Sequence, residues 1–169
     1  SKEGKNMGQR HITLSTCGLI NKIYELADED LQITLAVSLH APNDMIRNRI
    51  MPVSKANPMD KLLQACRDYV AKTNRRITFE YSLIKNVNDS AENAKELAEK
   101  LKGLLCHVNL IPVNDVKERD YVRSTNEAVK RFEGILTSRG IETTVRRKLG
   151  SDIDAACGQL RKRYKDEKR

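Results

Sequence analysis

The sequence predicts an α/β fold in which strands alternate with helices and pair into a mostly parallel sheet. Segments with apolar residues at every second position alternate with segments whose apolar residues recur every three or four positions. Strand–helix–strand units of this kind pack as right-handed parallel units. The chain has 169 residues, fewer than the about 250 of a closed eight-stranded α/β barrel. Any barrel that it forms must therefore be incomplete.

The strands are expected from their alternating patterns, which cover residues 11–15, 33–40, 77–83, 105–111 and 141–147. The second is typical, with Ile33, Leu35, Val37 and Leu39 facing away from the residues between them. Ligands bind at the carboxyl ends of parallel strands. Those ends carry Ser15, Ser38 with His40, and Pro112 with Asn114.

Helices are expected between these strands. A short helix covers about residues 19–27, a helical turn covers 44–49, and a long helix begins at Asn57 as N-cap with Pro58 in its first position. Asp89 with Glu92, and Ser124 with Glu127, predict the starts of two later helices, which Gly103 and Gly140 close. The long helix buries a stripe that makes Cys66 a core residue: Met59, Leu62, Leu63, Cys66, Tyr69 and Val70. The last helix buries Ala128, Val129, Phe132, Ile135 and Leu136.

Three segments organise the chain. Residues 1–9 are polar and predict a linker or the cut end of a longer protein, residues 10–161 form the folded part, and residues 162–169 form a basic tail that we expect to be frayed. No apolar run is long enough to span a bilayer, and no leader of the signal-peptide kind precedes the fold. We therefore expect a soluble, cytoplasmic protein without a membrane partner.

Composition favours a nucleic-acid partner. The chain has 31 Lys and Arg against 23 Asp and Glu, a formal net charge of +8. Residues 145–165 hold seven of the basic and two of the acidic side chains, and such dense tracts bind phosphate backbones. The four cysteines lie 40 or more residues apart, without a C-x-x-C pair. This spacing argues against a zinc site and a disulfide framework, so we expect reduced thiols.

Cys157 is the cysteine with the surroundings of a reactive thiol. Small residues flank it, and basic residues on both sides, including Arg147 and Arg161, favour its thiolate. The alternative is an inert cysteine on a buried helix face, because Ile153, Cys157, Leu160 and Tyr164 recur at helical spacing. The glycine directly after Cys157 argues mildly against that helix.

A second informative stretch is S-L-H-A-P-N-D, residues 38–44, which ends a strand with polar groups. These groups can bind a ligand. The simpler interpretation is that His40 is a satisfied strand-end histidine and that Asn43 or Asp44 caps a helix. The residues alone leave both possibilities open.

Four motifs resemble those of the radical S-adenosylmethionine RNA methyltransferases of the RlmN/Cfr family. They are D-I-D-A-A-C-G-Q-L around Cys157, S-L-H-A-P-N-D at 38–44, L-S-T-C-G at 14–18 and N-L-I-P-V-N at 109–114. They occur in the family's order and look more like the RlmN branch than like Cfr. The resemblance covers nearly all of residues 8–163 and implies part of a radical-SAM-type barrel.

The resemblance also implies a function. It identifies Cys157 as the cysteine that is methylated and then carries the methyl group to carbon 2 of an adenine in 23S rRNA and, in some members, in tRNA. It implies that S-adenosylmethionine is bound by the positions that match the family's cofactor motifs, which are Ser15, Ser38, Leu39, His40 and Asn114. A second cofactor, a four-iron-four-sulfur cluster, and an electron donor for it belong to the same chemistry.

The chain also departs from the family pattern. It has no C-x-x-x-C-x-x-C for the cluster, no G-E segment for the cofactor's methionine moiety and no second, resolving cysteine, and Asp115 stands where the family often has proline. We therefore expect the C-terminal portion of such an enzyme, inactive without its N-terminal part and without metal ligands of its own. The alternatives are a Cfr-type enzyme acting on carbon 8, a non-catalytic RNA-binding module, and a structural half-barrel that awaits a partner domain.

Overall fold

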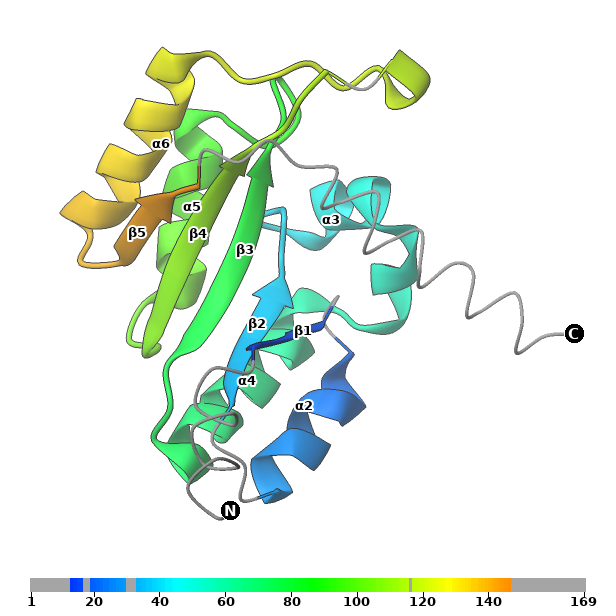
Figure 1. The fold of residues 1–169 in the computed structure, drawn as a ribbon, viewed down its shortest axis with the longest axis vertical. Coiled ribbons are helices and arrows are strands. Elements are labelled where there is room, and N and C mark those ends of the chain that lie inside the picture. The colour runs from blue at the N-terminus through cyan, green and yellow to red at the C-terminus, as the bar shows by residue number, and fades with distance from the viewer. Residues whose placement is uncertain (1–12, 17–18, 30–32, 116, 147–169) are drawn as a thin grey trace, which may run out of the picture.

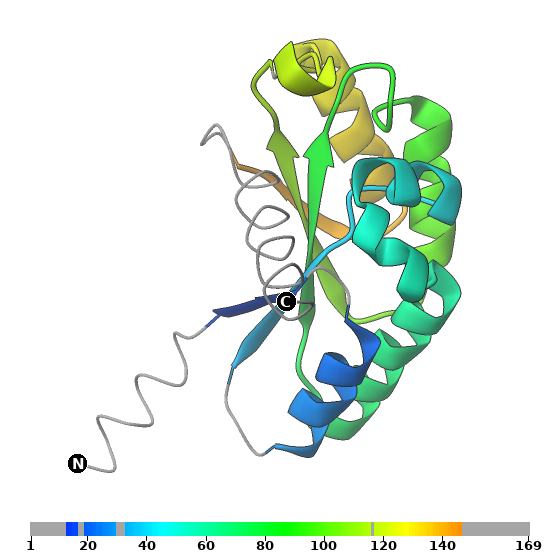
Figure 2. The same cartoon turned by 90° about the vertical axis from the view of Figure 1, so that its right-hand side faces the viewer.

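The described residues form one five-stranded parallel sheet covered by helices on one face (Figures 1 and 2). The structure is a computed structural model that describes residues 13–16, 19–29, 33–115 and 117–146. The strands stand in chain order, β1 (Thr13–Thr16), β2 (Thr34–Ser38), β3 (Ile77–Leu83), β4 (Cys106–Pro112) and β5 (Glu142–Val145). Every neighbouring pair is parallel. This order is that of an opened barrel, and the predicted fold class is confirmed.

The helices connect successive strands and pack on the same side of the sheet (Figure 2). They are α2 (Ile20–Asp28), α3 (Asp44–Ile50), α4 (Met59–Thr73), α5 (Ala91–Leu101) and α6 (Asn126–Ser138), with short 3-10 turns η1 (Pro52–Ala56) and η2 (Lys117–Arg119). Because every neighbouring pair of strands is parallel, all strands point their carboxyl ends toward the same edge. That edge is where the candidate side chains were expected.

The core lies between the helices and the sheet. The strands contribute Leu35, Val37, Phe79, Tyr81, Val108 and Leu110, all unexposed. The predicted stripe of α4 is buried except for Val70, and that of α6 except for Ile135, which are partly buried. Cys66 is unexposed and belongs to this core, as predicted.

α3 begins at Asp44, as predicted, but α4 begins one residue later than predicted. Pro58, not Asn57, is the N-cap of α4, and the Met59 N–H donates to Asp44 Oδ1 (2.8 Å). Asn57 Oδ1 instead accepts from the Ile20 N–H (3.1 Å) at the start of α2. An oxygen from a neighbouring element thus satisfies the free amide that a local cap would satisfy.

The two later caps lie one residue beyond the expected positions. Ser90 with Asn93, not Asp89 with Glu92, forms the capping box of α5. Thr125, not Ser124, caps α6 by accepting from the Ala128 N–H (3.1 Å). The reason is that the Asp89 carboxylate is buried and accepts from the Ser124 hydroxyl (2.7 Å). The predicted closing glycines are correct, since Gly103 (φ 78°) and Gly140 (φ 81°) adopt the left-handed conformation.

β3 has the predicted range 77–83, whereas the other described strands begin and end one or two residues from their predicted positions. β2 ends at Ser38 rather than at His40 because His40 turns the backbone to φ 60°. The predicted terminal segments 1–9 and 162–169, and the stretch around Cys157, lie outside the described residues. Within the described part of the chain, no helix is long and apolar enough to cross a membrane.

Candidate functional site

The carboxyl edge of β2 holds three of the predicted cofactor residues. Ser38 is the last residue of β2, and Leu39 and His40 follow it directly. Ser15 lies in the adjacent strand β1, in register with Ala36. Asn114 is exposed and lies just beyond β4, so β3 stands between it and the Ser38 segment. The fold thus brings Ser15 and the Ser38 segment onto neighbouring strands and places Asn114 farther along the same edge.

Ser38 and Leu39 are held closely by their surroundings. Ser38 is 4% exposed and Leu39 is unexposed, with its side chain in the main core. The Leu39 N–H donates to the Glu80 carbonyl (2.9 Å), and the Leu39 carbonyl accepts from Arg47 Nε (3.1 Å). Both backbone polar groups of Leu39 are therefore hydrogen-bonded inside the protein, and its side chain anchors the segment in the core.

His40 is a neutral hydrogen-bond donor in this structure. Its Nδ1 accepts from the Ser82 N–H (2.9 Å), so in the neutral ring the proton lies on Nε2. The pKa of His40 is lowered from 6.5 to about 3, mainly by burial and to a smaller extent by the positive charge of Arg47. The ring thus stays uncharged at physiological pH. The expectation of a satisfied strand-end histidine is correct for Nδ1, and Nε2–H is the group that a ligand can use.

The buried ring predicts a dependence of stability on pH. The unfolded chain binds a proton at His40 below pH 6.5, whereas the folded chain does so only near pH 3. The His40 contribution to stability is therefore complete above pH 6.5 and is lost by at most about 1.4 kcal/mol per pH unit as the pH falls.

The variant His40→Asn should remove this dependence, because asparagine tolerates the left-handed backbone and offers an oxygen in place of Nδ1. Urea unfolding of both proteins between pH 5 and 7.5 measures the difference. If the unfolding free energies of the two proteins changed with pH in parallel, His40 would titrate normally in the folded state.

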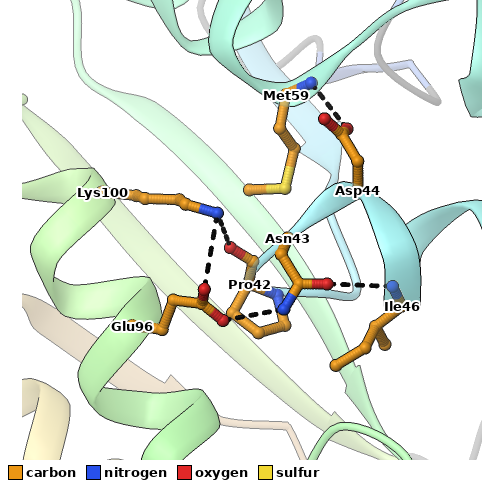
Figure 3. A network of polar contacts seen from close by, with 7 residues as sticks. All are labelled: Pro42, Asn43, Asp44, Ile46, Met59, Glu96 and Lys100. Carbon is orange, nitrogen blue, oxygen red and sulfur yellow. Dashed lines mark hydrogen bonds and ion pairs between the residues drawn. The ribbon is translucent and has the colours of Figure 1, made fainter.

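The A-P-N-D segment after His40 is fixed by a network of polar contacts (Figure 3). Asn43 caps α3, accepting from the Ile46 N–H (2.9 Å), and its Nδ2 donates to Glu96 Oε1 (2.8 Å). Lys100 donates to the Pro42 carbonyl and lies 3.9 Å from Glu96 Oε2. The structure therefore assigns Asn43 the capping role that was one of its two expected roles. These contacts connect the start of α3 to α5 and hold the backbone in place directly after residues 38–40.

Two residues that contact the site segment were missed from the sequence. Arg47 and Asn88 are unexposed, and both donate to carbonyls of residues 38–40. Arg47 resembled a surface residue of a short helical turn, and Asn88 resembled a loop residue before α5. The one available signal was the Asn-rich loop Asn86-Val87-Asn88-Asp89 directly after a strand.

Other candidate features lie apart from this segment. A pocket of about 450 Å³ opens where α5 and α6 begin, and it contains none of the predicted cofactor residues; it is lined by Lys85, Asn86, Asp89, Ser90, Asn93, Thr125, Ala128 and Arg131. Among the described residues, no group of three or more His, Cys, Asp or Glu side chains can hold a metal ion.

The described thiols are not nucleophiles. Burial raises the pKa of Cys66 to about 12 and that of Cys106 to about 11, so both stay protonated at neutral pH. Cys157, the predicted catalytic cysteine, lies outside the described residues.

Curated proteins similar to this chain share one description, "Probable dual-specificity RNA methyltransferase RlmN". That of Clostridium tetani (strain Massachusetts / E88) is 58% identical over 164 residues, which are 97% of this chain and 47% of the relative. That of Clostridium botulinum (strain Eklund 17B / Type B) is 62% identical over 161 residues, 95% of this chain and 46% of the relative. The chain thus spans about half the length of the curated relatives that it matches. No family model matches the chain.

Solved structures similar to this chain include a radical SAM methyltransferase. A radical SAM methyltransferase from Sphaerobacter thermophilus superposes with a TM-score of 0.82 at 52% identity, over 94% of this chain and 47% of that one. A domain of pyruvate-formate lyase-activating enzyme from Bacteroides vulgatus ATCC 8482 superposes with a TM-score of 0.64 at 21% identity, which shows likeness of fold alone.

Proposed function

Since this chain is homologous over nearly its whole length to the RlmN family of radical S-adenosylmethionine methyltransferases, as its motifs predicted, we propose that it is the C-terminal part of such an enzyme. The proposed enzyme methylates carbon 2 of an adenine in 23S rRNA and also acts on tRNA. The observation that carries the proposal is 58% identity over 97% of the chain to a named RNA methyltransferase. The matched relatives are about twice as long, and we place the cluster ligands in the half of these proteins that this chain does not match.

The edge residues fit S-adenosylmethionine in chemical type. Ser38, His40 and Asn114 are uncharged, and their hydroxyl, Nε2–H and amide groups match the ribose hydroxyls and ring nitrogens of an adenosyl group. The cofactor carries a positive sulfonium. A protonated histidine would repel it, so the low pKa of His40 suits this ligand. Ser15 and Leu39 complete the proposed binding set from β1 and from the end of β2.

Cys157 is the proposed methyl acceptor. Its thiolate attacks the methyl carbon of S-adenosylmethionine, a carbon–sulfur bond forms as the sulfonium carbon–sulfur bond breaks, and S-adenosylhomocysteine leaves. When bound, the four-iron-four-sulfur cluster and its electron donor supply the radical chemistry that moves the carbon on to the adenine. The role of this chain in that phase is to hold the thioether and the RNA base in contact.

The RNA partner is supported by charge. The chain is +8 overall, which favours a polyanion. We propose that this protein works in the cytoplasm, where ribosomes and transfer RNA function.

The test is methylation of 23S rRNA and tRNA fragments by the full-length protein, reconstituted with cluster and reductant, followed by nucleoside analysis. We expect 2-methyladenosine. A product of 8-methyladenosine would instead assign the Cfr-type reaction. RNA binding without methylated nucleoside would assign the non-catalytic module, and the function proposed above would be wrong.

A further inference from the structure

We propose that Asn88 and Arg47 are positioning residues that fix the backbone of Ser38, Leu39 and His40 in the conformation that binds the cofactor. The inference rests on the proposed function, because it concerns the same site. Its central observation is that the carbonyl oxygens of these three successive residues all accept hydrogen bonds from buried side chains.

His40 requires such support. Its φ of 60° lies in the left-handed region, which costs a non-glycine residue about 1–2 kcal/mol. A strained backbone persists where surrounding contacts determine it, and such strain concentrates at functional sites. The turn at His40 ends β2 and sets the direction of the imidazole.

Asn88 supplies the contacts on one side. One Nδ2 donates to both the His40 carbonyl (2.8 Å) and the Ser82 carbonyl (2.7 Å), which uses its two N–H groups. Asn88 Oδ1 accepts from the Ile84 N–H (2.8 Å), and its own carbonyl accepts from the Tyr81 hydroxyl (2.7 Å). The side chain is unexposed, and the hydrogen bonds of Oδ1 and Nδ2 fix its orientation. It ties the turn at His40 to the end of β3.

The same end of β3 holds the His40 ring. The Ser82 N–H donates to Nδ1, while the Ser82 carbonyl accepts from Asn88. The backbone and ring of His40 are thus fixed to one residue of β3 through two separate hydrogen-bond paths. This arrangement leaves the Nε2–H with a single direction in which to donate.

Arg47 supplies the contacts on the other side. Its Nη2 donates to the Ser38 carbonyl (3.3 Å) and its Nε to the Leu39 carbonyl (3.1 Å), and the whole side chain is unexposed. The planar guanidinium spans two carbonyls at a fixed spacing, which a lysine ammonium cannot do. Arg47 and Asn88 together define the path of all three residues.

The test is equilibrium dialysis of S-adenosylmethionine with the full-length protein and its Asn88→Ala variant. We expect the Kd to rise about tenfold in the variant, the loss that one to two buried hydrogen bonds produce, while affinity for RNA stays within about twofold. The released His40 ring should then gain access to water. A new pH dependence of the Kd between about pH 6 and 7 is therefore expected, which a merely structural role would not produce.

Two controls separate positioning from stability. Asn93→Ala removes an amide from the nearby capping box of α5, so it should lower the thermal midpoint without changing the Kd. Ser82→Ala removes a buried hydroxyl that has no hydrogen-bond partner among the described residues. It keeps the backbone contacts to His40, so neither the thermal midpoint nor the Kd should change. If Asn88→Ala does not fold, Arg47→Lys tests the same inference from the other side and should also raise the Kd.

An unchanged Kd in a folded Asn88→Ala or Arg47→Lys variant would overturn the positioning role and leave the proposed function intact. Absence of S-adenosylmethionine binding by the unaltered full-length protein would instead overturn the proposed function, and this inference with it.

Discussion

Cys157→Ala in the full-length protein is expected to abolish methyl transfer to RNA, by more than about a thousandfold, because alanine has no nucleophile to take the place of the proposed methyl-accepting thiolate. The proposed role requires the thiol to be accessible to cofactor and RNA, and under that proposal the thermal midpoint should change little because replacing an accessible sulfur creates little cavity. Methyl incorporation from labelled S-adenosylmethionine, together with a thermal melt, measures both quantities.

Cys66→Ala is the matched control, and the structure predicts the opposite outcome for it. Cys66 is unexposed in the main core, and burial raises the pKa of its thiol to about 12. Removing its sulfur leaves a small cavity that should cost about 1–2 kcal/mol of unfolding free energy, while methyl transfer persists.

Thiol alkylation gives a second comparison of the two cysteines. Cys157 should react with iodoacetamide at neutral pH well before Cys66, since the thiolate is the reactive form. Retained methylation in Cys157→Ala, or equal alkylation rates for Cys157 and Cys66, would favour the alternative of an inert cysteine on a buried helix face.

The fold could be predicted because its pattern is local. Alternation in residues such as Ile77, Phe79 and Tyr81 indicates a strand without knowledge of any partner, and these residues are unexposed in β3. The starts of α4, α5 and α6 could not be predicted to the residue, because adjacent residues compete for the same capping role. Asp89 had the right spacing for a cap, but tertiary contacts bury it against Ser124.

Some residues of the candidate site could likewise be predicted from the sequence, and others could not. The positions Ser38 and His40 follow from the rule that ligands meet the carboxyl ends of parallel strands. Arg47 and Asn88 do not, because their contacts join them to carbonyls 8 and 48 residues away in sequence. Every residue has a backbone carbonyl, so the sequence does not indicate which carbonyl accepts a hydrogen bond from a distant side chain. Such a side chain can be identified only in the folded chain.

Arg47→Met should destabilise the protein by roughly 3–5 kcal/mol, because each buried carbonyl left without a donor costs about 1–3 kcal/mol. Three carbonyls lose a donor, those of Ser38 and Leu39 and, through Nη1 (3.3 Å), that of Asn57. Methionine keeps most of the aliphatic volume, so the loss reports hydrogen bonds rather than a cavity.

Arg49→Met is the control for this change. Arg49 lies two positions later in α3 and is exposed, so its replacement should change stability by less than about 0.5 kcal/mol. Urea unfolding at pH 7.5 compares the two variants with the unaltered protein under conditions in which His40 does not titrate. Equal, small losses for both variants would show that water replaces the guanidinium at these carbonyls. In that case the end of β2 would be held by Asn88 and the β3 pairing alone.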